Sequence, residues 1–499
     1  MTAPDGTTLV DDVSFSVEAG SLVAVVGPTG AGKSTLLRAL TGDAPLASGS
    51  VRVYGGRAHG RVGYVPQENV LHSQLNLRRT LDDVASLQLG GAVDAAARRE
   101  RVQAVLGELG LVEQARLQVG VLSGGQQKRA NVAAELVSEP DVLVLDEPTS
   151  GLDPGYEKNV LGTLRRLAQR GRTVLAVTHS LRALELCDRV LFLAPGGRVA
   201  FFGPPQVAAA YFDTDDAAEV FLSLDADGGE GWKERFRSHP AYRRYVAPRA
   251  TADPSPAHDD SDAHPRMHAG GTLGRQVRTL VGRYAALIRA DRRHAVMLAL
   301  EGPLLGLLLL AVLSPHGLAR PHFTNHPNLT AKAVGLFFAI SVTWLGVSNT
   351  VREIVKERRI LRAEVGRGLS LRAYVSAKAM VLGTVTIGQA AALTFVGALR
   401  QNPPSGGSAL GNGRLELVVV VGLVAAAGVG LGLLLSALVD SPEKALTVLP
   451  VTLVAQLVCS GAFPSVLSQP GVAQLRNVTG TYWGVQAVEA TVRGDAAGW

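Results

Sequence analysis

Cysteine and charge are both scarce in this sequence. The two cysteines, Cys187 and Cys459, stand far apart and lack the spacing of metal ligands, so neither a disulfide framework nor a zinc site is indicated. Charged residues make up 18% of the chain and hydrophobic residues 47%, whereas a soluble protein usually carries about a quarter charged residues. This deficit of charge predicts membrane-spanning segments.

The start of the sequence does not predict a cleavable signal peptide. The first residues are polar and lead directly into an α/β pattern instead of an apolar leader. We therefore expect this end to lie in the cytoplasm. A length of 499 residues predicts two or three domains.

The most informative stretch is Gly27 to Thr35, which reads Gly-Pro-Thr-Gly-Ala-Gly-Lys-Ser-Thr. It follows an apolar strand pattern, Leu22 to Val26, and opens onto a helical pattern, Leu36 to Leu40. In this setting backbone N–H groups surround phosphate oxygens, and the helix N-terminus favours negative charge. A Gly-rich turn that binds nothing is the alternative, and both flanks argue against it. The expected phosphate-binding residues are Gly27, Gly30, Gly32, Lys33, Ser34 and Thr35.

Short apolar strands alternate with helical patterns as far as Phe212, which predicts an α/β domain with a largely parallel sheet. A second strand pattern, Val142 to Leu145, ends in Asp146 and Glu147. We expect Lys33 to reach the β and γ phosphates. Together with Ser34, Asp146 would hold Mg²⁺, and Glu147 would orient and deprotonate the attacking water.

Between these motifs lies Leu-Ser-Gly-Gly-Gln, residues 122–126, at the start of a helical pattern that runs to Leu136. A Ser-Gly-Gly turn at a helix start is an anion site by geometry. This run resembles the signature motif of ATP-binding cassette (ABC) ATPases. The resemblance implies that Ser123, Gly124, Gly125 and Gln126 contact nucleotide.

Three further positions resemble motifs of the same family, in the expected order. Gln67, in Tyr-Val-Pro-Gln, is similar to the glutamine that senses Mg²⁺ and the γ-phosphate; Asp153 is similar to the D-loop aspartate, and His179 to the switch histidine. Each alone also fits a simpler structural role: a strand-end polar residue, a turn former before Pro154, and a helix-capping neighbour. Their order together favours the ABC interpretation.

The resemblance implies ATP and Mg²⁺ bound between two cassettes, with the phosphate loop of one facing the signature turn of the other. This chain carries one copy of each motif, which predicts a homodimer or a pairing with another half-transporter. The family also stacks an aromatic residue on adenine from an early strand. Phe15 is the only aromatic residue before the phosphate loop and is not a convincing candidate, so the adenine contact stays open.

Residues 213–272 are expected to form a linker between the cassette, residues 1–212, and a membrane domain, residues 273–499. Trp232 to Val246 has a helical pattern that could pack on the cassette. Asp253 to Gly271 is rich in Pro and small residues, which predicts a flexible segment. Its histidines, His258, His264 and His268, fit a solvated linker better than a metal site.

Each apolar run in the second half is close to the roughly 20 residues that cross a membrane. The expected spans are Ala295 to Leu313, Ala331 to Asn349, Val375 to Leu399, Leu415 to Val439 and Ala445 to Phe463. The loop Val351 to Tyr374 is rich in Arg and Lys and should be cytoplasmic, whereas Ser314 to Thr330 should be external. The basic amphipathic stretch Leu273 to Arg293 should lie along the cytoplasmic membrane face.

Glu301 lies inside the first expected span. A carboxylate there is costly unless it faces a cavity or a partner. A position near the headgroups is the equally weighted alternative, because Glu301 is only about 9 Å from the start of the span at 1.5 Å per residue.

A cassette followed by a membrane domain resembles the G (white/pigment) subfamily of ABC half-transporters and their bacterial relatives with an ABC-2 type membrane domain. That family implies a docking helix after the second span, here Glu357 to Glu364, and six spans. Only five are found here, and Pro464 to Trp499 resembles the external segment before the sixth. We therefore expect the C-terminus to be truncated.

These features predict an ATP-driven exporter in the cytoplasmic membrane that moves a lipid-like or hydrophobic substrate. Membrane lipid and a second half-transporter are the expected partners, and nucleic acid is not. The alternatives are a soluble ABC ATPase, a regulatory membrane protein with a degenerate cassette, and an importer. The apolar spans argue against the first. Intact Lys33, Asp146, Glu147 and His179 argue against the second, and the fusion of cassette and membrane domain argues against the third.

Overall fold

The computed structural model describes residues 8–53, 62–91, 93–178, 184–214, 217–226, 229–246, 272–312, 329–399, 409–461 and 472–493. The chain divides into two compact units. The first contains Met1–Arg275 and Ala363–Leu369, and the second contains Gln276–Arg362 and Ser370–Trp499.

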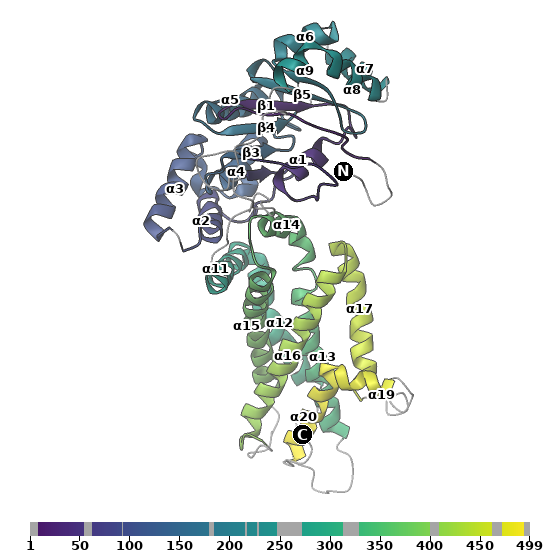
Figure 1. The fold of residues 1–499 in the computed structure, drawn as a ribbon. Coiled ribbons are helices and arrows are strands. Elements are labelled where there is room, and N and C mark those ends of the chain that lie inside the picture. Colours follow the sequence, from purple (N-terminus) through teal and green to yellow (C-terminus); the bar gives the residue numbers. More distant parts are fainter. Residues whose placement is uncertain are drawn as a thin grey trace. The chain divides into compact units, whose positions relative to one another are not determined.

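A six-stranded sheet forms the centre of the first unit (Figure 1), and its strand order is β2-β3-β4-β1-β5-β6. The strands are β1 (Leu22–Val26), β2 (Val62–Val65), β3 (Val142–Leu145), β4 (Thr173–Val177), β5 (Arg189–Ala194) and β6 (Arg198–Gly203). All neighbours are parallel except β5 and β6, which are antiparallel. The predicted α/β domain with a largely parallel sheet is therefore confirmed. The carboxyl ends of β1, β2 and β3 lie at one edge of this sheet.

Helices surround the sheet, and several of them begin at a capping side chain. They are α1 (Lys33–Thr41), α2 (Leu77–Gln88), α3 (Ala95–Glu108), α4 (Gly124–Leu136), α5 (Pro154–Gln169), α6 (Pro205–Phe212), α7 (Ala217–Ala226), α8 (Glu230–Ser238) and α9 (Pro240–Tyr245), with short 3₁₀ turns at Glu113–Arg116, Val119–Val121 and Leu184–Leu186. The side chains of Asn76, Asp94, Ser123 and Asp153 accept backbone N–H groups at the starts of α2, α3, α4 and α5. Each such cap is worth about 1 kcal/mol.

The core of this unit continues past Phe212. Trp232 and Phe236 of α8 are buried in the same hydrophobic cluster as the strands, and the rings of Phe236 and Phe201 are 5.6 Å apart. The predicted helical character of Trp232 to Val246 is confirmed, with a break at His239 between α8 and α9. The predicted flexible segment Asp253 to Gly271, with its three histidines, lies outside the described residues.

The rest of the chain is helical. The helices are α11 (Leu273–Ala290), α12 (Arg292–Val312), α13 (Leu329–Thr350), α14 (Arg358–Gly366), α15 (Leu371–Gly397), α16 (Gly413–Leu438), α17 (Pro442–Cys459), α19 (Val472–Leu475) and α20 (Gly480–Arg493), with 3₁₀ turns at Val355–Glu357 and Arg476–Val478. Within the described residues, five helical segments are long and apolar enough to cross a membrane: Arg292–Val312, Lys332–Gly366, Leu371–Gly397, Gly413–Leu438 and Pro442–Cys459. They agree in number and order with the five predicted spans.

The helix α20 occupies a region where the sequence shows no further long apolar run. It packs against α13 and α16, and its residues Val485, Val488 and Val492 are buried in the same cluster as Val424 of α16. With 14 residues, α20 is shorter than the roughly 20 residues of a full span. It contributes to the helical bundle through side-chain packing.

Glu301 has a partner inside the bundle. The Nε2 of Gln389 on α15 donates to Glu301 Oε2 at 3.2 Å and to the Leu298 carbonyl at 2.6 Å. Asn349 of α13 donates to Gln389 Oε1 at 2.7 Å and to Thr386 Oγ1 at 3.0 Å. These hydrogen bonds join α12, α13 and α15, and they favour the partner-facing alternative for Glu301 over a headgroup position.

Glycine allows α13 and α16 to approach closely. A Cβ atom added to Gly346 would lie 2.7 Å from the Ala425 carbonyl oxygen, and one added to Gly428 would lie 3.1 Å from the Thr343 carbonyl oxygen. Backbone atoms cannot rotate away as a side chain can, so position 346 requires glycine, and a side chain at position 428 would be tightly packed. Such small-residue contacts are a common way for apolar helices to associate in membranes.

We predict that Gly346→Ala lowers the free energy of unfolding by about 1–3 kcal/mol, because the new methyl group overpacks the helix contact. Thermal unfolding of the purified chain in detergent measures this effect. Gly430→Ala on α16 is the matched control, since its Cβ would meet no atom within 4 Å. Equal stability of the two variants would contradict the close contact.

Candidate functional site

The loop after β1 has the backbone geometry of an anion-binding turn. All five residues of β1 are buried, which fixes the position from which the loop departs. Gly30 and Gly32 have φ values of 84° and 83°, in the left-handed region that favours glycine. A Cβ added to Gly27 would lie 2.3 Å from the Leu193 carbonyl oxygen. The glycine pattern noted in the sequence is thus required by the shape of the loop.

Lys33 begins α1 and folds back over this loop. Its Nζ donates to the carbonyls of Gly27 and Pro28, both at 2.8 Å, and the residue is 7% exposed. Burial lowers the pKa of Lys33, while the nearby Glu147 and Asp146 carboxylates oppose that shift. The ammonium is therefore held at the loop by carbonyl oxygens and carboxylates.

Ser34 and Asp146 come together across the edge of the sheet. The Ser34 hydroxyl donates to Asp146 Oδ1 at 3.3 Å, and the Tyr64 hydroxyl donates to Asp146 Oδ2 at 3.4 Å. Burial, followed by the Asp146 charge, raises the pKa of Tyr64, so its phenol stays a donor. A hydroxyl and a carboxylate in contact form the type of oxygen donor set that suits Mg²⁺.

Gln67 and Glu147 form the second pair at this edge. The Gln67 Nε2 donates to Glu147 Oε2 at 2.8 Å, and the Lys128 Nζ donates to the Gln67 carbonyl at 2.5 Å. Burial lowers the pKa of Lys128, and the Glu147 charge opposes this. Glu147 itself has a φ of 46°, an uncommon value for a residue other than glycine that costs about 1–3 kcal/mol and often marks a functional position.

The signature turn forms a separate cluster at the start of α4. The Gln126 N–H donates to Ser123 Oγ at 3.4 Å, and the Ser123 N–H donates to Gln126 Oε1 at 2.9 Å. This reciprocal pair is a capping box. The glycines pack closely on the next motif, since a Cβ on Gly124 would lie 3.2 Å from Leu152 and one on Gly125 would lie 3.3 Å from Tyr156. Ser123 and Gly124 remain exposed.

Asp153 caps α5 by accepting the Tyr156 N–H at 3.3 Å. This is the structural role that a residue before Pro154 was expected to have, and it places Asp153 beside the signature turn through Tyr156. Asp153 is exposed, so the cap leaves part of its carboxylate accessible. The two roles weighed for Asp153 are compatible in this geometry.

The structure brings Lys33, Ser34, Gln67, Asp146 and Glu147 to one edge of the sheet. His179 lies outside the described residues. Sequence reasoning missed two functional candidates, Tyr64 and Lys128. Both residues lie within the motif stretches described above. What their side chains contact is shown only by the β2–β3 register, which aligns Val65 with Leu145, and by the position of α4.

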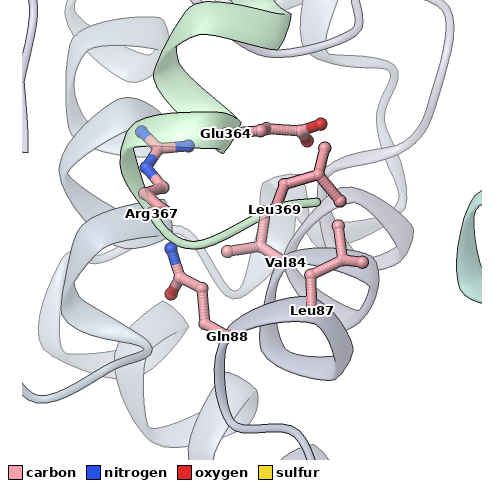
Figure 2. Close-up of a pocket in the computed structure, with 6 residues that line it drawn as sticks. All are labelled: Val84, Leu87, Gln88, Glu364, Arg367 and Leu369. Atoms are coloured by element: carbon pink, nitrogen blue, oxygen red, sulfur yellow. The ribbon is translucent and has the colours of Figure 1, made fainter. Parts of the chain in front are cut away.

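A small pocket lies between α2 and the chain at the end of α14 (Figure 2). It is lined by Val84, Leu87 and Gln88 from α2 and by Glu364, Arg367 and Leu369. The last three belong to the predicted cytoplasmic loop, Val351 to Tyr374, and Glu364 is the last residue of the predicted docking helix. Residues 363–369 group with the first unit. Residues of α2, the helix that follows Gln67, and residues of the loop between two apolar spans therefore line the same pocket.

A buried ion pair holds this loop segment. The Arg367 Nε donates to Glu135 Oε1 on α4 at 2.6 Å, and a second guanidinium nitrogen contacts the same oxygen. Glu135 is 3% exposed and Arg367 9%. Burial raises the pKa of Glu135, and the Arg367 charge and hydrogen bond oppose this. Removal of either partner would leave an uncompensated charge in the interior.

A parallel α/β domain with this phosphate loop and paired carboxylates, joined to apolar helices, defines a membrane protein with a nucleotide-binding domain. Two family models match the chain: residues 10–150 match the model described as ABC transporter, and residues 275–491 match the model described as ABC-2 type transporter. The chain belongs to the ABC transporter family.

Individual relatives match different extents of the chain. The ABC transporter ATP-binding/permease protein Rv1747 of Mycobacterium tuberculosis is 37% identical, and the match covers 97% of this chain and 56% of the relative. ABC transporter G family member 25 of Arabidopsis thaliana is 29% identical over 95% of this chain and 76% of the relative. The hemin import ATP-binding protein HmuV of Rhodopseudomonas palustris is 38% identical over 40% of this chain and 79% of the relative. The chain thus spans just over half of the mycobacterial protein.

We predict that Arg367→Ala lowers the free energy of unfolding by about 3–5 kcal/mol at neutral pH, because Glu135 stays buried without its partner. Without Arg367 the folded-state pKa of Glu135 rises further above the unfolded value of about 4.3. The folded state then retains a proton that the unfolded state releases, so the stability of the variant falls as pH rises above about 4.

Thermal unfolding of the full chain between pH 5 and pH 8 measures this prediction. Arg170→Ala is the control, because Arg170 is 62% exposed in its ion pair with Glu108 and such exposed pairs contribute about 0–1 kcal/mol. If Arg367→Ala is as stable as this control at every pH, the ion pair between Glu135 and Arg367 does not hold residues 363–369 in place.

Proposed function

We propose that this protein is an ATP-driven exporter of the cytoplasmic membrane that works as a dimer. The observation that carries the proposal is the pairing of Ser34 with Asp146 and of Gln67 with Glu147 beside the phosphate loop, in a chain that also matches an ABC-2 type membrane domain. The first feature provides nucleotide chemistry, and the second provides the route across the bilayer.

In this proposal the phosphate loop and Lys33 bind the nucleotide phosphates, and Ser34 and Asp146 hold Mg²⁺. Bound Mg²⁺ supplies positive charge against the β and γ phosphates. Gly27, Gly30, Gly32 and Thr35 shape the loop and the start of α1. The carbonyls that now receive the Lys33 ammonium keep it near the place where phosphate charge would enter.

Glu147 is the proposed general base, which orients water and takes its proton. Gln67 donates to the Glu147 carboxylate, and Lys128 donates to the Gln67 backbone. These contacts fix the direction of the carboxylate and keep Gln67 next to it. His179 is proposed as the residue that contacts the γ-phosphate, by resemblance to the family motif.

The proposed dimer follows from the separation of the two clusters. Ser123 and Gly124 are exposed at the start of α4, with Gly125, Gln126 and Asp153 beside them. This surface would complete the nucleotide site of the second subunit. A homodimer is the simplest arrangement, and a pairing with another half-transporter is the other.

Movement would pass from nucleotide to membrane through Gln67 and α2. The helix α2 follows Gln67 in the chain and lines the pocket that holds Arg367 and Leu369. The helix α14 begins in the membrane unit and ends in the cassette unit, so displacement of its last residues is carried covalently into the membrane helices.

The Arg-rich and Lys-rich loop Val351 to Tyr374 supports a cytoplasmic cassette. A lipid-like or hydrophobic cargo is proposed from the resemblance to the G subfamily. The hemin import named for one relative concerns a protein that matches the cassette alone, and it gives no reason to propose the same cargo here. A soluble or regulatory ATPase is less well supported, because residues 275–491 match a transporter membrane domain.

We predict that Glu147→Gln lowers ATP hydrolysis by roughly one hundred- to ten thousand-fold, since the amide cannot accept the proton of water. Binding of ATP should be preserved. Phosphate release from the full chain in lipid vesicles measures the loss, and Glu100→Gln on the exposed face of α3 is the control. Wild-type turnover in Glu147→Gln would remove Glu147 from the base role.

We also predict that two inactive variants complement one another. Lys33→Ala disables the phosphate loop, and Ser123→Arg blocks the signature turn of the other subunit. A mixed dimer of the two contains one intact site, so purified mixed dimers should regain hydrolysis that neither homodimer shows. Mixed dimers as inactive as both parents would contradict a composite site.

A further inference from the structure

Among the described residues that precede the phosphate loop, the one aromatic side chain packs against the core of the cassette. Phe15 is the only aromatic residue before the phosphate loop. Its ring packs against Phe202 of β6, with the ring centroids 5.6 Å apart, and it is partly buried against the core. Phe15 is therefore occupied within the protein.

An open cleft of about 300 Å³ borders the phosphate loop. One side is formed by Gly27, Pro28 and Thr29, and the other side is formed by Phe221, Leu222 and Asp225 of α7. A cleft of this size is in the range of small-ligand sites, about 300–1,000 Å³. Its continuity with the phosphate loop means that a nucleotide bound there would extend toward α7.

The side chains from α7 differ in exposure and chemistry. Leu222 is 71% exposed, and Phe221 is partly buried and packed against the core. Asp225 is exposed and lines the same cleft. An apolar surface next to an acceptor of hydrogen bonds matches the face and the exocyclic amine of an adenine base.

We propose that α7 completes the nucleotide site: Phe221 and Leu222 pack on the adenine ring, and Asp225 accepts a hydrogen bond from its N6 amine. This inference rests on the proposed function and names the base contact that the sequence leaves open. A carboxylate has acceptors only, so Asp225 would favour an N6 amine over the O6 acceptor of a hypoxanthine base. The helix α7 thereby sets the preference for ATP.

The test uses the full chain in detergent, with Mg²⁺ and two probes: a non-hydrolysable ATP analogue and inorganic tripolyphosphate. Phe221→Ala should weaken binding of the ATP analogue roughly 5- to 150-fold, the range that a lost base–aromatic contact gives. Tripolyphosphate binding should change less than about twofold. Phe221→Tyr, which keeps the ring, should retain binding of the analogue.

Leu222→Ala provides a second variant that leaves the core intact, because Leu222 is mostly exposed. It should also weaken the ATP analogue selectively. Leu117→Ala, at a leucine that is 47% exposed elsewhere on the cassette, is the matched control and should change neither probe. Lys33→Ala should weaken both probes, since it acts on the phosphates.

Asp225→Asn tests the amine contact. Inosine triphosphate differs from ATP in carrying an oxygen at C6 in place of the amine, and an Asn side chain can donate to that oxygen. The ratio of ATP affinity to inosine triphosphate affinity should therefore fall in Asp225→Asn. An unchanged ratio would overturn the role of Asp225.

The outcomes separate this inference from the proposed function. Equal affinity of the wild type, Phe221→Ala and Leu222→Ala for the ATP analogue would overturn the α7 contact and leave the phosphate site standing. Equal affinity of the wild type for tripolyphosphate and for the ATP analogue would also overturn the α7 contact, because the base would then contribute nothing to binding. A wild type that binds neither probe would overturn the proposed function and this inference together.

Discussion

The parallel pairing of β1, β4, β3 and β2 places the carboxyl ends of these strands at one edge of the sheet, and the chemistry of the cassette depends on that edge. The loop after β1 carries Lys33 and Ser34, whereas Asp146 and Glu147 follow β3 and Gln67 follows β2. Their hydrogen bonds cross between segments that are far apart in the chain. A change in strand register would move these side chains away from one another, because each is fixed by the end of a buried strand.

The segment 363–369 is held by a second constraint, the ion pair between Glu135 and Arg367. Both groups are buried, so separating them would leave a charge without water or a partner, which costs several kcal/mol. This makes the segment a permanent part of the cassette unit, although it follows apolar helices in the chain. The pocket lined by α2 and residues 364–369 and this ion pair give a physical basis to the proposed coupling between nucleotide and membrane helices. The end of α14 is held by the cassette and has to move with it.

The membrane unit combines close packing with polar contacts. Glycines at positions 346, 428 and 432 let α13 and α16 approach, and Gln389 joins Glu301 to Asn349. Near the start of α15, the buried Lys378 forms ion pairs at 2.8 Å with both Glu353 and Glu357. Polar groups in an apolar surrounding are stable only when they are paired, so these networks specify which helix faces meet.

Local patterns in the sequence determined much of this protein. The bounds of β1 and β3, the motif loops and the five apolar spans follow from runs of neighbouring residues and from the fixed geometry of strands and helices. Other features were decided only by tertiary structure: the reach of Lys128 to Gln67, the pairing of Glu135 with Arg367, the packing of the short α20 and the cleft between α7 and the phosphate loop. Each joins residues that are distant in the chain, and their meeting depends on how buried faces pack. No local periodicity carries that information.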